Sequence, residues 1–150
     1  MDGLRDLVAA CREGRAPYQS LVDRVPYANF LGIEITARGE ELTFVLPQRD
    51  TNLGNPTLPA LHGGAVAGFM EQAAIIFLLL EMGEPRVPKT IDFTIDYLRA
   101  GLPRDAYARA RVNRSGRRYA SVHVEGWQDN RARPFAQATG HFLMPDRARA

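Results

Sequence analysis

The sequence predicts an α+β fold in which a single antiparallel sheet wraps around one long, buried helix. Residues 61–80 read LHGGAVAGFMEQAAIIFLLL, and Glu71 is the only charged residue between Ala65 and Leu80. A helix that is apolar on every face has to be enclosed by other elements. Two strand-like runs precede this helix and four follow it, so only a sheet has enough sequence to enclose it. A chain of 150 residues is long enough to bury such a core as one domain.

The part of the chain before the helix predicts two short helices and a hairpin. Apolar residues recur at helical spacing over residues 2–15, and a second short helix spans 18–25 and ends at Pro26. Two strands, 31–37 and 41–47, are joined by a tight turn. We therefore divide the chain into an N-terminal helical segment (1–26), a core (27–144) and a polar tail (145–150).

A loop and the central helix connect the hairpin to the later strands. Residues 48–61 are rich in Asn, Gly and Pro, which is typical of a loop. After the helix, apolar and polar residues alternate most clearly in VHVE at 122–125, as expected of a half-buried strand. The four strands span 90–99, 106–113, 118–128 and 134–144. A sheet wrapped around a central helix in this order is the hotdog arrangement.

Composition excludes several classes of protein. The net charge is only +2 and there is no arginine run, so nucleic-acid binding is not indicated. Cys11 is the only cysteine, which excludes an internal disulfide, and the three histidines show no metal-ligand spacing. We expect no metal and no cofactor. The helix is interrupted by glycines and by Glu71, so we expect no membrane span. The N-terminus has no apolar signal core, so we expect a cytoplasmic location.

The central helix carries two features that suggest chemistry. Glu71 is a lone carboxylate among apolar residues, and such groups are candidates for tuned acids, bases or nucleophiles. The helix begins at His62-Gly63-Gly64, where backbone N–H groups lie at the positive end of the helix dipole. One helix therefore offers both a buried base and a terminus that polarises an electrophile.

These residues resemble the hotdog thioesterases of the phenylacetate-associated (PaaI-like) group over about residues 27–144. That group combines a loop asparagine, an HGG sequence and a helix carboxylate, which here are Asn55, His62-Gly63-Gly64 and Glu71, nine positions after the histidine (71 − 62 = 9). The segments KTIDFTIDYLRAG and RSGRRYASVHVEGW resemble later strands of the family. Many relatives carry Asp where this chain has Glu71. The loop is about one residue longer than usual, so Asn52 is an alternative to Asn55.

The resemblance implies a role for each of these residues in hydrolysing an acyl-CoA thioester. The Gly63 N–H, aided by Gly64, stabilises the developing negative charge on the thioester carbonyl. Glu71 acts as general base or as nucleophile, and sequence does not separate the two. The Thr90 hydroxyl supports Glu71 or the attacking water, while Asn55 orients the water or the carbonyl. His62 lies near the thiol leaving group or fixes the loop.

The spacing of the helix residues argues for a shared active site. Nine residues of α-helix rise about 13 Å, so Glu71 and the glycine N–H groups of one chain do not meet at one reaction centre. They meet when two helices pair antiparallel, and the resemblance implies the same arrangement. We predict a homodimer with shared sites, or a tetramer of two such dimers.

Three arginines are candidates for binding the phosphates of CoA, and two other functions compete with hydrolysis. Arg99, Arg117 and Arg118 follow or precede strands, and a guanidinium suits phosphate geometry. A hotdog dehydratase also uses a carboxylate and a histidine around the central helix, although the HGG start fits thioesterases better. A non-catalytic acyl-CoA binding module is the third interpretation.

Overall fold

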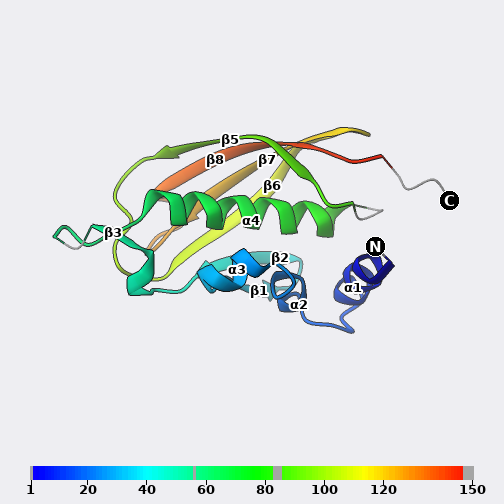
Figure 1. The fold of residues 1–150 in the computed structure, drawn as a ribbon, viewed down its shortest axis with the longest axis horizontal. Helices are drawn as coiled ribbons and strands as arrows, with labels where there is room; N and C mark the ends of the chain where they lie inside the picture. Colours follow the sequence, from blue (N-terminus) through cyan, green and yellow to red (C-terminus); the bar gives the residue numbers. More distant parts are fainter. Residues whose placement is uncertain (1, 56, 83–85, 147–150) are drawn as a thin grey trace.

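The computed structural model of the protein describes residues 2–55, 57–82 and 86–146. Six strands form one antiparallel sheet in the order β1-β2-β6-β7-β8-β5, which curves around the helix α4 (Figure 1). The predicted α+β hotdog fold is confirmed. The elements are α1 (Asp2–Arg12), α2 (Gln19–Val22), α3 (Pro26–Leu31), β1 (Glu34–Arg38), β2 (Glu41–Leu46), the 3-10 helix η1 (Asp50–Asn52), β3 (Leu53–Asn55), β4 (Ala60–Leu61), α4 (Gly63–Glu81), β5 (Lys89–Tyr97), β6 (Ala106–Ser115), β7 (Tyr119–Trp127) and β8 (Ala136–Leu143).

The helix α4 forms the centre of the hydrophobic core. Phe69, Met70 and Ala73 on α4 are completely buried, as are Val122 and Val124 on β7. Their neighbours Ser121, His123 and Glu125 are only partly buried, so the alternation predicted for this strand is confirmed. By length and apolar composition α4 also resembles a membrane span. In this fold its buried side chains belong to the same core cluster as those of the sheet.

One predicted boundary is wrong, because Pro26 begins a helix instead of only ending one. Val25 is extended (φ −100°, ψ 108°), and Pro26 is the first residue of α3. Proline fits the first turn of a helix because its missing N–H would have no partner there. Gly32 ends α3 in the left-handed region (φ 75°). The first strand therefore starts at Glu34, three residues later than the sequence predicts.

The segment 48–61, predicted as a loop, contains ordered structure that leads into α4. After η1, the short strands β3 and β4 pair antiparallel, with Leu53 opposite Leu61 and Asn55 opposite Ala60. This ribbon extends from the sheet beside the N-terminus of α4 (Figure 1). It places the residues before His62 directly against the start of the helix.

The Arg12 side chain at the end of α1 caps the C-terminus of α4. Its Nε donates a hydrogen bond to the carbonyl oxygen of Leu80 at 2.7 Å, and its Nη2 donates to the carbonyl oxygens of Leu80 and Met82. The last carbonyls of a helix lack intrahelical donors and carry partial negative charge. The N-terminal helix is thus tied to the core helix through a charged donor.

Replacing Arg12 with glutamine is expected to lower the free energy of unfolding by about 2 kcal/mol, since hydrogen bonds to charged groups contribute about that amount. Urea denaturation at constant protein concentration measures the change. Arg15→Gln is the matched control, because among the described residues the Arg15 side chain pairs with the exposed Glu13 alone, and its loss should cost less than about 1 kcal/mol. Equal effects of the two substitutions would contradict the capping role.

Candidate active site

His62 caps the N-terminus of α4 with its imidazole. Its Nδ1 accepts a hydrogen bond from the Gly64 N–H at 2.9 Å, and its backbone is extended (φ −63°, ψ 129°). An accepting Nδ1 places the proton of the neutral ring on Nε2. A Cβ on Gly64 would lie 2.9 Å from the imidazole, so glycine is required there for the cap to form. The Gly64 N–H is therefore engaged by His62.

Gly63 presents a free backbone N–H at the start of the same helix. Among the described residues no acceptor contacts this N–H, whereas the Gly63 carbonyl accepts a hydrogen bond from the Tyr97 hydroxyl at 2.7 Å. Its φ is not positive, so the backbone conformation does not demand glycine. What glycine provides is space, because a Cβ would lie 3.1 Å from the Tyr97 oxygen. This N–H is open to a ligand.

The two candidate asparagines have different surroundings. Asn55 is exposed, and its Oδ1 accepts hydrogen bonds from the N–H groups of Thr57 (2.9 Å) and Leu58 (3.1 Å), which makes it a turn-forming residue. Asn52 is only 3% exposed, and its Nδ2 has no partner among the described residues. The Asn52 carbonyl accepts the His62 N–H at 2.7 Å. The structure therefore brings Asn52 next to His62 with an unused amide donor.

Glu71 lies halfway along α4, partly buried and without a charged partner. No hydrogen bond or ion pair joins its carboxylate to any described residue, and burial raises the pKa of this carboxyl above its ordinary value of 4.5. Glu71 follows Gly63 by eight residues (71 − 63 = 8), which corresponds to about 12 Å along the helix. One chain therefore does not bring the carboxylate to the free N–H.

The remaining predicted site residues lie at both ends of the sheet. Thr90 is exposed near the start of β5. Arg117 and Arg118 precede β7 at the end of the sheet near the C-terminus of α4, and the Arg118 Nε lies 3.6 Å from Asp146 Oδ1. Arg99 follows β5 at the opposite end, near the N-terminus of α4 (Figure 1). Only Arg99 is brought to the end of the helix where Gly63 lies.

A cavity of about 420 Å³ opens at the N-terminus of α4. Two of the residues that line it, Tyr97 and Phe135, are not among the site residues that the sequence predicts. Tyr97 lies in the segment KTIDFTIDYLRAG, whose family resemblance could have pointed to it. Nothing in the sequence shows that the end of β5 and the residue before β8 meet here. The backbone N–H of Leu98 donates to the Phe135 carbonyl at 2.8 Å and joins these segments. The cavity is lined by Leu61, Gly63, Val66, Tyr97, Arg99, Ala100, Gly101 and Phe135.

The wrapped sheet and the cavity at the start of its central helix define a hotdog-fold protein. The chain belongs to the thioesterase superfamily, because the model of that family matches residues 58–134. This match runs from the turn before β4 to the turn between β7 and β8, and so includes the HGG sequence and Glu71. The family resemblance stated from the sequence is confirmed.

Several solved structures are similar to the chain. A protein from Chromobacterium violaceum is 38% identical, with 92% of this chain and 96% of that chain covered and a TM-score of 0.73. A phenylacetic acid degradation-related protein from Ralstonia eutropha is 23% identical (92% and 99% covered, TM-score 0.73). A protein from Bacillus halodurans, solved with CoA, is 22% identical (99% and 91% covered, TM-score 0.73). The last two likenesses concern the fold alone. No curated protein matches the chain.

Proposed function

We propose that the protein hydrolyses an acyl-CoA thioester to a free acid and CoA. The observation that carries this proposal is the free N–H of Gly63, a residue that lines the cavity of about 420 Å³ at the positive end of α4. A thioester carbonyl oxygen held at this N–H develops negative charge during attack, and the N–H and the helix dipole stabilise that charge. Membership of the thioesterase superfamily supports the proposal.

Glu71 is the proposed base or nucleophile. As a base, its carboxylate takes a proton from the water that attacks the thioester carbon; as a nucleophile, it displaces the thiolate and forms an anhydride that water then cleaves. A carboxyl whose pKa is raised by burial is a stronger base than an ordinary glutamate. We assign Thr90, which belongs to the same chain as Glu71, to supporting this carboxylate or the water.

Asn52 is the better candidate for the functional asparagine. Its buried Nδ2 lacks a partner, and its backbone is bonded to His62, whereas the Asn55 side chain is occupied by its own turn. We propose that the Asn52 amide orients the attacking water or the acyl carbonyl. His62 and Gly64 then hold the start of α4 in the conformation that leaves the Gly63 N–H open.

We propose that the active protein is a homodimer, and the edge strand β5 supports this. The nine residues of β5 form one edge of the sheet, with β8 as their only partner strand among the described residues. Ile91 is 55% exposed and Tyr97 is 52% exposed on this strand. A long, apolar, unpaired edge strand tends to be covered by another chain. Pairing of two β5 strands would continue the sheet across two copies.

A partly exposed stripe of α4 points to the same partner. Gly64, Ala67, Glu71 and Ile75 recur every three or four residues, so they share one face of the helix, and none of them is fully buried by its own chain. The small residues on this face permit close approach of a second helix. Two antiparallel α4 helices would bring Glu71 of one copy toward Gly63 of the other. Each site would then take Gly63, His62 and Asn52 from one chain and Glu71 and Thr90 from its partner.

Release of free thiol from a panel of acyl-CoA esters tests the function. The panel runs from acetyl-CoA to palmitoyl-CoA and includes phenylacetyl-CoA, with thiol detected by a chromogenic disulfide. We expect turnover of at least one ester. The absence of thiol release from every ester would overturn the hydrolytic proposal. Calorimetric binding of CoA esters without turnover would then favour a binding module, and hydration of an enoyl-CoA would favour a dehydratase.

A further inference from the structure

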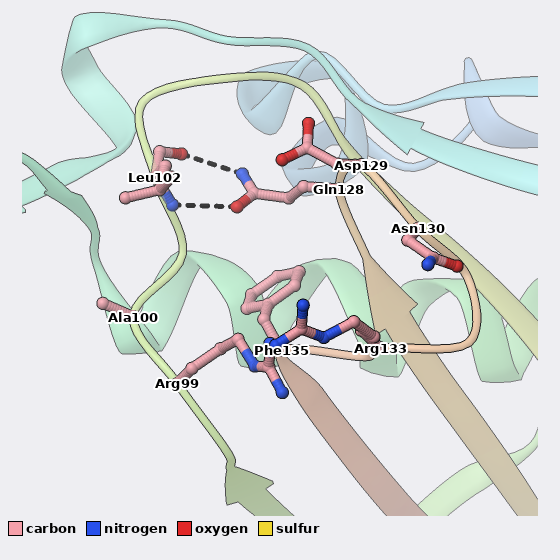
Figure 2. A pocket seen from close by; sticks show the side chains of 8 residues that line it. All are labelled: Arg99, Ala100, Leu102, Gln128, Asp129, Asn130, Arg133 and Phe135. Atoms are coloured by element: carbon pink, nitrogen blue, oxygen red, sulfur yellow. Dashed lines mark hydrogen bonds between the residues drawn. The ribbon is translucent and has the colours of Figure 1, made fainter.

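A second cavity adjoins the one at the start of α4, and we infer that it binds the phosphate groups of the CoA moiety through Arg133 and Arg99. This inference rests on the proposed function. The second cavity measures about 270 Å³ and lies between the segment after β5 and the turn that joins β7 to β8 (Figure 2). It is lined by Arg99, Ala100, Leu102, Gln128, Asp129, Asn130, Arg133 and Phe135.

The walls of this cavity are held by specific hydrogen bonds. The Gln128 side chain forms a two-pronged contact with the backbone of Leu102, accepting its N–H at 2.9 Å and donating to its carbonyl at 2.8 Å (Figure 2). The Asn130 side chain accepts the Ala132 N–H at 2.9 Å and so shapes the turn that carries Arg133. These bonds fix the two segments relative to each other before any ligand arrives. Such preorganisation lowers the entropic cost of binding.

The cavity carries excess positive charge. Neither the Arg99 nor the Arg133 guanidinium has a hydrogen bond, ion pair or ring contact within the part of the chain that the structure describes. The carboxylate of Asp129 also lines the cavity, but it is already paired with Arg104, whose Nη1 lies 2.7 Å from both of its oxygens. Asp129 is therefore neutralised, and two guanidinium groups remain available. Planar guanidinium groups match the geometry of phosphate oxygens.

The two cavities are joined by shared walls. Arg99, Ala100 and Phe135 line both of them, and the Arg99 N–H donates to the Phe135 carbonyl at 3.2 Å. In this proposal, a ligand whose carbonyl lies at Gly63 crosses the shared wall formed by Phe135, Ala100 and Arg99 before it reaches Arg133. This order, from a polarised carbonyl through an apolar passage to a cationic pocket, matches an acyl-CoA, in which an uncharged pantetheine arm separates the thioester from the phosphates.

A comparison of two substrates tests the assignment. An acyl-CoA carries the phosphates, whereas the same acyl group on N-acetylcysteamine keeps the thioester but carries none. We expect Arg133→Gln to raise KM for the acyl-CoA about tenfold and to leave kcat for it within about twofold. Hydrolysis of the N-acetylcysteamine ester should be unchanged. Arg131→Gln is the matched control, since Arg131 lies on the same turn but contacts the Trp127 ring and not this cavity.

Direct binding separates failure of this inference from failure of the proposed function. Calorimetry with CoA and with 3′,5′-ADP needs no turnover, and Arg133→Gln should weaken both about tenfold. If wild type hydrolyses acyl-CoA and Arg133→Gln changes neither KM nor the affinity for CoA, the phosphate assignment is overturned. The proposed hydrolytic function would stand in that case. A rise in KM for both thioesters would also overturn the assignment. In that case Arg133 would contact the acyl group, which both substrates share, and not the phosphates.

Discussion

Replacing Glu71 with glutamine is expected to lower kcat/KM for acyl-CoA hydrolysis by at least about 10²-fold, a typical size for the loss of a general base. Glutamine keeps the volume of the side chain and removes only its ability to accept a proton or attack the carbonyl carbon. Glu81→Gln, at the exposed end of the same helix, is the matched control and should leave the rate unchanged. Thiol release under identical conditions measures both. A Glu71→Gln variant that is as active as wild type would exclude Glu71 from the reaction.

The pH dependence of the same two proteins provides a second readout. Burial raises the Glu71 pKa above 4.5, and the reaction requires the ionised carboxylate, so activity should fall with decreasing pH through a midpoint above that value. A raised carboxyl pKa means that the folded state binds protons more readily than the unfolded state. The ionised group therefore destabilises the fold above its raised pKa, and this cost disappears below about pH 4.5. Glu71→Gln should accordingly be more stable than wild type at neutral pH and not at low pH.

A heterodimer of two inactive variants is expected to regain about half of the wild-type rate, because one of its two shared sites is intact. One chain carries Glu71→Gln and the other carries Gly63→Val, whose side chain would fill the space beside the Tyr97 hydroxyl. In the mixed dimer, one site combines both substitutions and the other contains neither. Each homodimer alone carries a defect in both sites and should be slower by about 10²-fold or more.

Co-expression with two different affinity tags and sequential purification isolates the mixed dimer for this measurement. Circular dichroism and gel filtration of each homodimer confirm that the variants fold and pair. A mixed dimer no faster than its parents would show that Glu71 and Gly63 act within one chain. Since about 12 Å of helix separates these residues, such a result would require a different reaction centre from the one proposed.

The sequence contains enough local information to predict most elements of this fold. A long apolar run with one carboxylate predicts a buried core helix, and the alternation at Val122 and Val124 identifies one face of a strand without any knowledge of its neighbours. Pro26 shows where local reasoning fails, because the same residue that stops one helix is well suited to start another. Which of the two occurs depends on what the following residues pack against.

Some residues of the candidate site are likewise predicted by the sequence, and others are recognised only in the folded structure. The HGG sequence and Glu71 suggest the reaction class through the family resemblance. The spacing between them predicts a site shared by two chains, since helix geometry is a property of the sequence interval alone. The preference for Asn52 over Asn55, by contrast, depends on the folded segment before α4, in which η1 buries the Asn52 side chain and bonds its carbonyl to His62, while Asn55 at the end of β3 is exposed and caps its own turn.

The tertiary structure also decides which arginines lie near the site. Arg133 lies 34 positions after Arg99 in the chain (133 − 99 = 34), and unlike Arg99 it looks like any other surface arginine in the sequence. The two line one cavity because the Gln128 contact with Leu102 and the bonds of Leu98 and Arg99 to Phe135 hold two distant segments together. Helix and strand periodicity follow from neighbouring residues, so the sequence by itself determines them. The meeting of distant side chains follows from packing, which only the folded chain establishes.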